Sequence, residues 1–343
     1  MTKKTYKAAL FYGPGDLRIE DVPFEPLNPG ELRVQIGAAT TCGTDKKTYL
    51  RGHPVLIKTY PARVGHEMAG TVSEIGKDIS RFQVGDRVVI PNSAPCGTCF
   101  FCEKNQQNLC ENLIFLNGAY AESLVVPAQI VRNNLYKIPD SLSFEQAALT
   151  EPLACVLHAC DHIGVQARET VVILGTGPMA YLFMQALKIH DAKPIVVGRN
   201  PERLQFFSRH APVIDNTKSG WEKQVRKFTT PYGADVAIES VGQPELWEKA
   251  LQLVRQGGRV CLYGGCQKGI PFSLDTYRLH YEEITVSGAF HHTPQSIKKA
   301  LRLLTENLID TKPFLEEKRT LHDLPQILSG NDSKNAMKYV VQP

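Results

Sequence analysis

The sequence predicts an α/β protein that joins a doubly wound parallel sheet to a β-rich domain. Residues 170–174 are an apolar, β-branched run followed by a glycine turn and a helical pattern. Five further strand-like runs then alternate with helical segments, as in a doubly wound sheet. Earlier in the chain, residues 31–36 and 85–90 read as strands bounded by glycine turns. At 343 residues, of which 43% are hydrophobic and 22% charged, the chain has material for more than one domain.

The parallel sheet is expected to contain six strands, each returned to the sheet by a crossover helix. The predicted strands are residues 170–174, 194–197, 213–214, 235–239, 258–263 and 284–288.

The glycine turn of residues 175–180, GTGPMA, indicates a dinucleotide cofactor. Gly175 permits a tight turn, Gly177 lets the backbone approach the pyrophosphate, and Ala180 allows helix and strand to pack closely. The pyrophosphate would then lie at the helix N-terminus. The residues expected to line the cofactor are Gly175, Gly177, Pro178, Met179, Gly198, Arg199, Asn200, Arg203 and Gly264.

The end of the second strand favours NADP(H) over NAD(H). Gly198 stands where NAD(H)-binding proteins place an acidic residue against the ribose, and Arg199 follows it. Loss of the carboxylate relieves repulsion of a 2′-phosphate, and a guanidinium offers it charge-assisted hydrogen bonds. The alternative is that Arg199 is a solvated loop residue, which leaves NAD(H) open.

Four of the nine cysteines fall at Cys96, Cys99, Cys102 and Cys110 in a C-x2-C-x2-C-x7-C pattern. Short links let successive thiolates face one ion, and the longer loop closes a tetrahedron around zinc. Four thiolates leave no open position, so this zinc is expected to be structural. An iron–sulfur cluster or four unrelated buried thiols are the alternatives.

Composition argues against a nucleic-acid or membrane partner. The net charge of +4 is spread thinly, and basic residues occur as short pairs without interleaved aromatics. We expect no signal peptide and no membrane span, because no apolar run approaches the length of about 18 residues that a span needs. A cytoplasmic protein is therefore expected, in which clustered cysteines bind metal rather than form disulfides.

A second set of ligand types is dispersed through the chain. Cys42, His66 and Glu67 are the residue types that hold a catalytic zinc and leave one position open. Glu151 lies in an apolar run, where a charge is costly unless it is paired or bound to a cation. The alternatives are packed core residues and, for Glu151, a carboxylate that caps a helix start.

Taken together and in this order, CGTD, GHE, the four-cysteine pattern, TEP and GTGPMA resemble the zinc-dependent medium-chain dehydrogenase/reductase family over essentially the whole chain. The sorbitol and threonine dehydrogenases are the most similar branch, because Glu67 follows His66 and Glu151 replaces a cysteine. The resemblance implies a GroES-like β-rich catalytic domain at residues 1–145 that contains the structural zinc lobe at residues 93–112. It also implies a Rossmann cofactor domain at residues 146–290, and a return of residues 291–343 to the first domain.

The resemblance also implies roles at the active site. Cys42 and His66, with Glu67 or Glu151, would bind a catalytic zinc, and one glutamate could act through a water. Thr44 would take the proton of the alcohol, unless it only caps a helix or turn. Lys47 stands where relatives carry the histidine that ends this relay. The substrate would be contacted by Tyr49, Phe115, His291 and His292, with simple exposure as the alternative for the two histidines.

We therefore expect a zinc-dependent, NADP(H)-preferring oxidoreductase that interconverts a secondary alcohol of a polyol or sugar-like compound with its ketone. Ser93 stands where threonine dehydrogenases usually carry a histidine, which disfavours threonine. The alternatives are an NAD(H)-linked alcohol or amino-alcohol dehydrogenase and a catalytically silent, zinc-stabilised nucleotide-binding protein. The expected partners are a small-molecule substrate and further copies of the chain, as a dimer or homotetramer.

Overall fold

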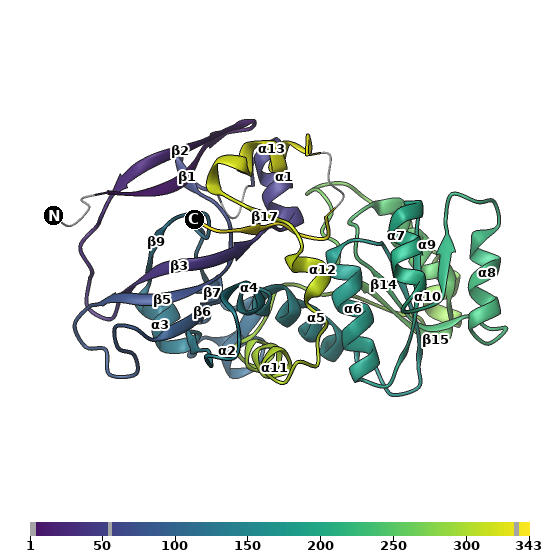
Figure 1. Cartoon of the computed structure of the whole chain (residues 1–343). Helices are drawn as coiled ribbons and strands as arrows, with labels where there is room; N and C mark the ends of the chain where they lie inside the picture. The colour runs from purple at the N-terminus through teal and green to yellow at the C-terminus, as the bar shows by residue number, and fades with distance from the viewer. Residues whose placement is uncertain (1–4, 54–56, 333–335) are drawn as a thin grey trace. The chain divides into compact units, whose positions relative to one another are not determined.

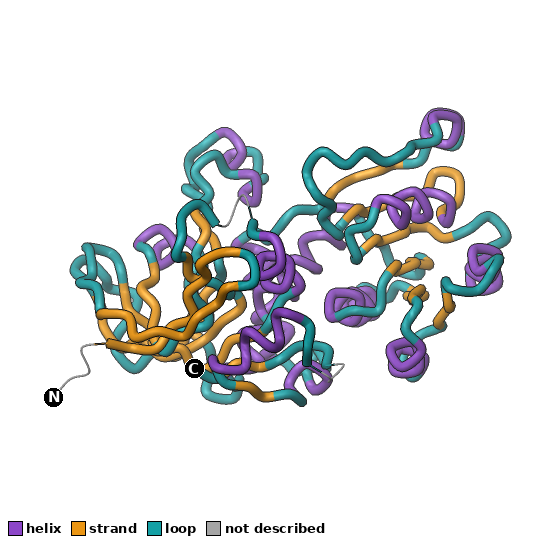
Figure 2. Tube along the Cα trace, turned by 90° about the horizontal axis from the view of Figure 1, so that it is seen from above, coloured by secondary structure: helices purple, strands orange, loops and turns teal. Residues whose placement is uncertain are grey.

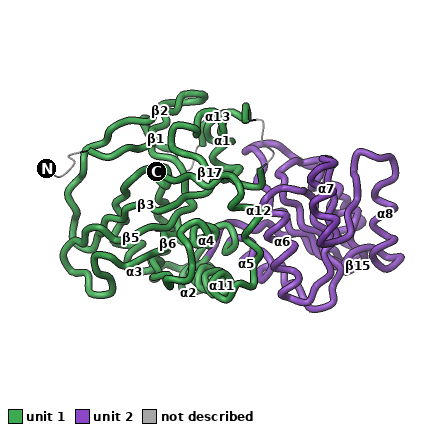
Figure 3. Tube along the Cα trace, viewed as in Figure 1, with its two compact units in different colours: residues 1–154, 293–343 green, residues 155–292 purple. Residues whose placement is uncertain are grey.

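The computed structural model describes residues 5–53, 57–332 and 336–343, and these residues form two compact units (Figure 3). One unit contains residues 1–154 and 293–343, and the other contains residues 155–292. The first unit is therefore built from both ends of the chain. Within the described part of the chain, none of the helices combines the length and the apolar composition needed to cross a membrane.

The sheets of the first unit are antiparallel except for the parallel pair β17–β18 (Figure 1). A three-stranded sheet has the order β2-β1-β4, and a seven-stranded sheet has the order β10-β6-β5-β3-β18-β17, with β9 also pairing with β3. Their bounds are β1 Thr5–Gly13, β2 Asp16–Pro23, β3 Leu32–Thr40, β4 Ala62–Arg63, β5 Glu67–Ile75, β6 Arg87–Ile90, β9 Ser123–Val126, β10 Tyr136–Lys137, β17 Lys318–Arg319 and β18 Val340–Val341. β7 (Ser93–Ala94) and β8 (Ile114–Phe115) form a separate two-stranded sheet.

Strand β3 lies at the centre of the larger sheet and brings distant parts of the chain together. Its end pairs with the start of β5 at Thr40–Glu67 and with β18 at Thr40–Val340. Residues near positions 40, 67 and 340 consequently lie on three adjacent strands. Behind them the core contains fully buried side chains such as Phe11, Met68 and Tyr120.

Short helices connect these strands. The bounds in this unit are α1 Gly43–Arg51, α2 Phe100–Glu103, α3 Ala128–Asn133, α4 Phe144–Ala148, α11 Pro294–Thr305, α12 Lys312–Leu315 and α13 Leu324–Ser329, with short 3₁₀ turns at Gln107–Leu109 and Leu321–Asp323. Helix α5 (Thr150–Ile163) begins in the first unit and continues into the second.

The second unit is the predicted parallel sheet. All six predicted strands are present, and every pairing between them is parallel, in the order β13-β12-β11-β14-β15-β16. Their bounds are β11 Thr170–Leu174, β12 Lys193–Gly198, β13 Val213–Asp215, β14 Ala234–Glu239, β15 Val254–Leu262 and β16 Thr285–Gly288. The strand order reverses beside β11, as it does in a doubly wound sheet. The prediction for this half of the chain is thus confirmed, with β15 starting four residues earlier than residue 258.

Helices pack on more than one side of this sheet, as Figure 2 shows. Their bounds are α6 Pro178–Ile189, α7 Pro201–Ser208, α8 Trp221–Phe228, α9 Pro244–Leu253 and α10 Thr276–Tyr281. The buried faces of the strands and helices form one core that includes Val172, Ile195 and Trp221. Proline at the first turn of α6, α7 and α9 suits a helix start, because its missing N–H would have no partner there.

Candidate metal centres and cofactor site

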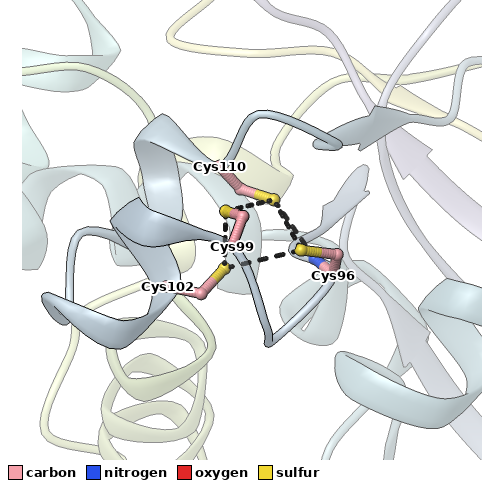
Figure 4. A group of neighbouring side chains, drawn as sticks. All are labelled: Cys96, Cys99, Cys102 and Cys110. Carbon is pink, nitrogen blue, oxygen red and sulfur yellow. Dashed lines mark hydrogen bonds between the residues drawn. The ribbon is translucent and has the colours of Figure 1, made fainter.

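The four clustered cysteines converge on one point (Figure 4). Their Sγ–Sγ distances are 4.0 Å for Cys96–Cys102, 3.6 Å for Cys99–Cys102, 3.7 Å for Cys99–Cys110 and 3.5 Å for Cys96–Cys110. Four sulfurs at about 2.3 Å from one zinc would be about 3.8 Å apart at the corners of a tetrahedron. These residues therefore fit a single tetrahedral ion, and the separations are too short to hold a multi-iron cluster between them.

The pKa values of the thiols in this lobe differ widely. The backbone N–H of Thr98 is the largest influence on Cys96 and lowers the pKa of its thiol to about 5. Burial raises the pKa of Cys102 to about 12. A bound cation would deprotonate all four, because zinc is ligated by thiolates. These thiols form hydrogen bonds with other groups of the lobe, including the Cys96 N–H, which donates to the Cys110 Sγ at 3.2 Å.

A second group brings together Cys42, His66 and Glu67, whose ligand atoms all lie within 4.8 Å of one another. Cys42 is the N-cap of α1, where its Sγ accepts the Thr44 N–H at 3.5 Å. His66 and Glu67 stand at the entry to β5. Thiolate, imidazole and carboxylate are the donor set of a zinc centre that keeps a position open. The residues present thus fit a second zinc.

The side chain of His66 is oriented by Asp45. The Nδ1 of His66 lies 3.1 Å from Asp45 Oδ1, so Nε2 is the nitrogen left for a metal. Asp45 Oδ2 accepts the Tyr120 hydroxyl at 2.5 Å and the Cys42 N–H at 2.9 Å. Although burial opposes both charges, their attraction lowers the pKa of Asp45 and raises that of His66. Burial, then the charge of Asp45, raises the pKa of Tyr120, so its hydroxyl stays protonated and donates the hydrogen bond to Asp45.

Gly65 explains why Tyr120 can reach this position. Its φ of +85° is strained for other residues, and a Cβ there would lie 2.8 Å from the Tyr120 ring. Gly65 therefore leaves the space that the Tyr120 ring occupies beside Asp45.

Glu67 is held by a buried lysine near the other end of the chain. The Nζ of Lys338 donates to the two carboxylate oxygens at 2.6 and 2.7 Å and to the Thr41 carbonyl at 2.8 Å. The Thr40 hydroxyl donates to Glu67 as well. The side chains of Lys338 and Glu67 are only 1% and 0% exposed. Burial opposes the charge on Lys338, but Glu67 and then Cys42 hold its pKa above the usual value, so the lysine stays charged.

Glu151 lies near this centre without belonging to its group of three. It occupies the second position of α5, is buried, and its charge contributes to the raised pKa of Lys338. The group of described residues around Cys42 comprises Cys42, His66 and Glu67.

The remaining predicted active-site residues are spread over several elements. Thr44, Lys47 and Tyr49 are on α1; Lys47 is exposed, and the Tyr49 hydroxyl donates to the Gly15 carbonyl at 3.0 Å. Phe115 pairs with Ser93 at the base of the cysteine lobe. His291 and His292 follow β16, with ring centroids 4.0 Å apart.

Four residues near the Cys42 centre were missed by the sequence interpretation: Asp45, His53, Tyr120 and Lys338. Asp45 could have been found, because it stands three residues after Cys42 at the position of a capping box. Burial, then the nearby charge of His66, lowers the pKa of His53. Lys338 lies 271 residues from Glu67, and nothing in the local sequence pairs them.

The candidate cofactor site is the glycine turn between β11 and α6. Gly175 has a φ of +130°, and a Cβ there would lie 2.5 Å from the Ser240 hydroxyl. Gly177 is the N-cap of α6, and Pro178 and Met179 begin that helix. A Cβ on Gly264 would lie 2.2 Å from the Gly242 nitrogen. The turn thus has the strand, close glycines and helix N-terminus that a pyrophosphate requires.

The adenosine end of this site lies where β12 ends. Gly198 is buried and Arg199 is exposed. The Asn200 side chain accepts the Arg203 N–H at 2.9 Å and so caps α7. Hence Asn200 has a structural role beside the cofactor role expected of it.

Two family profiles match the chain: the alcohol dehydrogenase GroES-like domain over residues 28–140 and the zinc-binding dehydrogenase domain over residues 178–306. The sorbitol dehydrogenase of Bacillus subtilis (strain 168) is 30% identical over 328 residues, which cover 92% of this chain and 90% of that protein. This chain belongs to the zinc-type alcohol dehydrogenase family. The (R,R)-butanediol dehydrogenase of the same organism is also 30% identical, over 98% of this chain and 99% of its own.

The solved structures agree with the fold of this dehydrogenase. A zinc-binding dehydrogenase from Sinorhizobium meliloti 1021, crystallised with NADP, superposes with a TM-score of 0.91 at 26% identity and covers 99% of this chain and 100% of its own. The predicted GroES-like and Rossmann fold is confirmed, as is the expected class of zinc-dependent alcohol or polyol oxidoreductase.

Proposed function

We propose that this dehydrogenase is NADP(H)-preferring and interconverts a secondary alcohol of a polyol or sugar-like compound with its ketone. The observation that carries the proposal is the convergence of Cys42, His66 and Glu67 within 4.8 Å, beside the buried Lys338. We assign the chemistry to the domain predicted at residues 1–145 with 291–343, and the cofactor to residues 146–290.

Zinc bound at this centre would act as a Lewis acid that polarises the substrate oxygen and lowers the pKa of the alcohol. Cys42 and His66 are its proposed ligands, with Glu67 or Glu151 as the carboxylate. Asp45 keeps the His66 ring in one orientation through the 3.1 Å contact at Nδ1. Lys338 neutralises Glu67, which favours weak binding of that carboxylate to the ion and leaves room for a substrate oxygen.

Proton transfer is proposed to pass through the start of α1. Thr44 is two residues from Cys42 on this helix, and Cys42 rather than Thr44 is the N-cap. The Thr44 hydroxyl is therefore not required as a cap and can take a proton from the alcohol. Lys47 lies one turn further along the helix and is exposed to solvent, which suits the outer end of a relay.

The NADP(H) preference rests on the end of β12. Gly198 offers no carboxylate, and the exposed Arg199 can form paired hydrogen bonds with a 2′-phosphate. The likeness to a dehydrogenase crystallised with NADP supports this choice. The likeness to sorbitol and butanediol dehydrogenases supports a polyol substrate, with Tyr49, Phe115, His291 and His292 as candidate contacts.

We further propose a cytoplasmic homo-oligomer with two zinc ions in each chain. A reducing compartment would keep the four lobe cysteines available as thiolates.

The test is a polyol and sugar screen that follows absorbance of the reduced nicotinamide with each cofactor. We expect kcat/KM to be at least about tenfold higher with NADP(H), since one lost charged hydrogen bond costs about 1.5–3 kcal/mol. Arg199→Gln should lose most of that preference while keeping its activity with NAD(H). Equal use of both cofactors by the wild type would contradict the cofactor proposal, and turnover of simple alcohols alone would contradict the polyol proposal.

A further inference from the structure

The end of β12 and the glycine turn after β11 meet at Gly198 and Thr176. Strands β11 and β12 are paired in parallel up to Leu174–Val197, and the Gly175 N–H donates to the Val197 carbonyl at 2.8 Å. On its other side, the Gly198 carbonyl accepts the Asn216 N–H at 2.8 Å. Backbone hydrogen bonds therefore fix Gly198 beside the turn, and it cannot easily move away from Thr176.

A side chain at position 198 has no room while Thr176 is present. A Cβ built on Gly198 would lie 2.3 Å from Cγ2, 3.0 Å from Oγ1 and 3.2 Å from Cβ of Thr176. Rotation about χ1 can turn the two γ atoms aside, but the Cβ–Cβ distance of 3.2 Å stays tight. Gly198 is not among the glycines with a positive φ. Glycine is therefore required here by space and not by backbone conformation.

Charged residues of both signs surround this contact, since Asp215 is the strand partner of Gly198 and Glu202 lies in the first turn of α7. Arg199 is exposed, Arg203 is in the first turns of α7, and Lys218 is 70% exposed at its side chain. The Nζ of Lys218 lies 3.8 Å from Asp215, and the Asp215 carboxylate also accepts the N–H and the hydroxyl of Thr217 at 3.0 and 2.7 Å. A carboxylate added at position 198 would lie at the place where it would repel a phosphate.

We propose that Thr176 determines cofactor specificity. By filling the space beside Gly198, it excludes the carboxylate that would accept the ribose hydroxyls of NAD(H), and so reserves the adenosine end for a dinucleotide with a 2′-phosphate. This inference rests on the proposed NADP(H) preference and adds the residue that enforces it.

The test uses Gly198→Asp, Thr176→Gly and the double variant, with Thr176→Ser as the matched control that removes only the methyl group. Unfolding midpoints are measured without cofactor, and Kd values for NADH and NADPH are measured by nicotinamide fluorescence. We expect Gly198→Asp alone to lower Tm by on the order of 5 °C and to weaken both cofactors about tenfold or more, because overpacking strains the turn.

In the double variant we expect Tm to recover to that of Thr176→Gly, and NADH to bind at least about tenfold more tightly than NADPH, since a fitted carboxylate pairs with the ribose and repels the phosphate. Combined with Gly198→Asp, Thr176→Ser should restore part of the lost Tm and part of the lost cofactor affinity. Gly198→Ala, which adds only the Cβ, shows the same Tm coupling if the aspartate variant fails to fold.

An unchanged Tm in both Gly198→Asp and Gly198→Ala would overturn the inference, as would equal losses with and without Thr176. The Tm coupling is measured without cofactor, so it stands or falls independently of the cofactor preference. If wild-type protein binds NADH as tightly as NADPH, the proposed function fails even where the steric coupling is present.

Discussion

The two candidate metal centres are built in opposite ways. The four-cysteine lobe would draw its ligands from residues 96–110, and its thiols are hydrogen-bonded to one another and to nearby backbone groups. In the Cys42 centre each ligand already has a protein partner: His66 faces Asp45, Glu67 is paired with Lys338, and Cys42 caps a helix. These partners come from α1 and the C-terminal segment.

The difference shows how each centre is assembled. Four thiolates in the lobe would repel one another without a cation, so a bound ion would supply much of the stability of this local loop. In the Cys42 centre the fold itself places and neutralises the ligands. Metal can therefore bind there with one position left open, and its loss should leave the surrounding structure in place.

The largest expected effect comes from Cys42→Ser. Activity should fall by at least about 10³-fold, because metal-ion stabilisation of the reacting oxygen is worth several kcal/mol and each tenfold in rate is about 1.36 kcal/mol. Zinc content should fall by one ion in each chain, with Tm changed by only a few degrees, on the order of 1 kcal/mol. Activity and metal content are measured together, and Cys266→Ser, outside both groups, is the control. A large drop in Tm would remove the distinction between the two centres.

Cys99→Ser should have the reverse profile. Loss of the lobe zinc is expected to lower the free energy of unfolding by about 3–4 kcal/mol and Tm by on the order of 10 °C. The KM of the remaining folded enzyme should stay within about twofold, because the lobe holds a closed site. Thermal unfolding and initial rates at a temperature below both midpoints provide the comparison. Wild-type thermal stability in this variant would show that the lobe does not depend on its metal.

A smaller effect is expected for Lys338→Met in metal-free protein. Removing the lysine leaves the Glu67 carboxylate buried without its counter-charge, which should cost about 3 kcal/mol. Urea unfolding would measure this loss. Lys338→Arg, which keeps the charge, should lose less, and the double variant Lys338→Met with Glu67→Gln should recover part of the stability. If the double variant is no more stable than the single one, the ion pair is not what neutralises Glu67.

The sequence by itself determined the elements that depend on neighbouring residues. The β-branched runs, the glycine turn at residues 175–180 and the six parallel strands follow from patterns of a few residues, and the structure contains them all. The cysteine lobe could be predicted from the sequence in the same way, because a C-x2-C-x2-C-x7-C spacing permits tetrahedral ligation within one loop. Cys42, His66 and Glu67 could be named from the sequence mainly through the family resemblance.

Only the tertiary structure decided which groups neutralise and orient these ligands. Lys338 reaches Glu67 because β3 pairs with β18 on one side and with β5 on the other. No local sequence pattern encodes this strand order and register. Tyr120 reaches Asp45 because Gly65 leaves space for its ring. Thr176 meets Gly198 because β11 and β12 are adjacent in the sheet. Such contacts depend on burial and strand order. An unpaired charge costs free energy only where water is excluded, and an extra methyl group does so only where the interior is already closely packed.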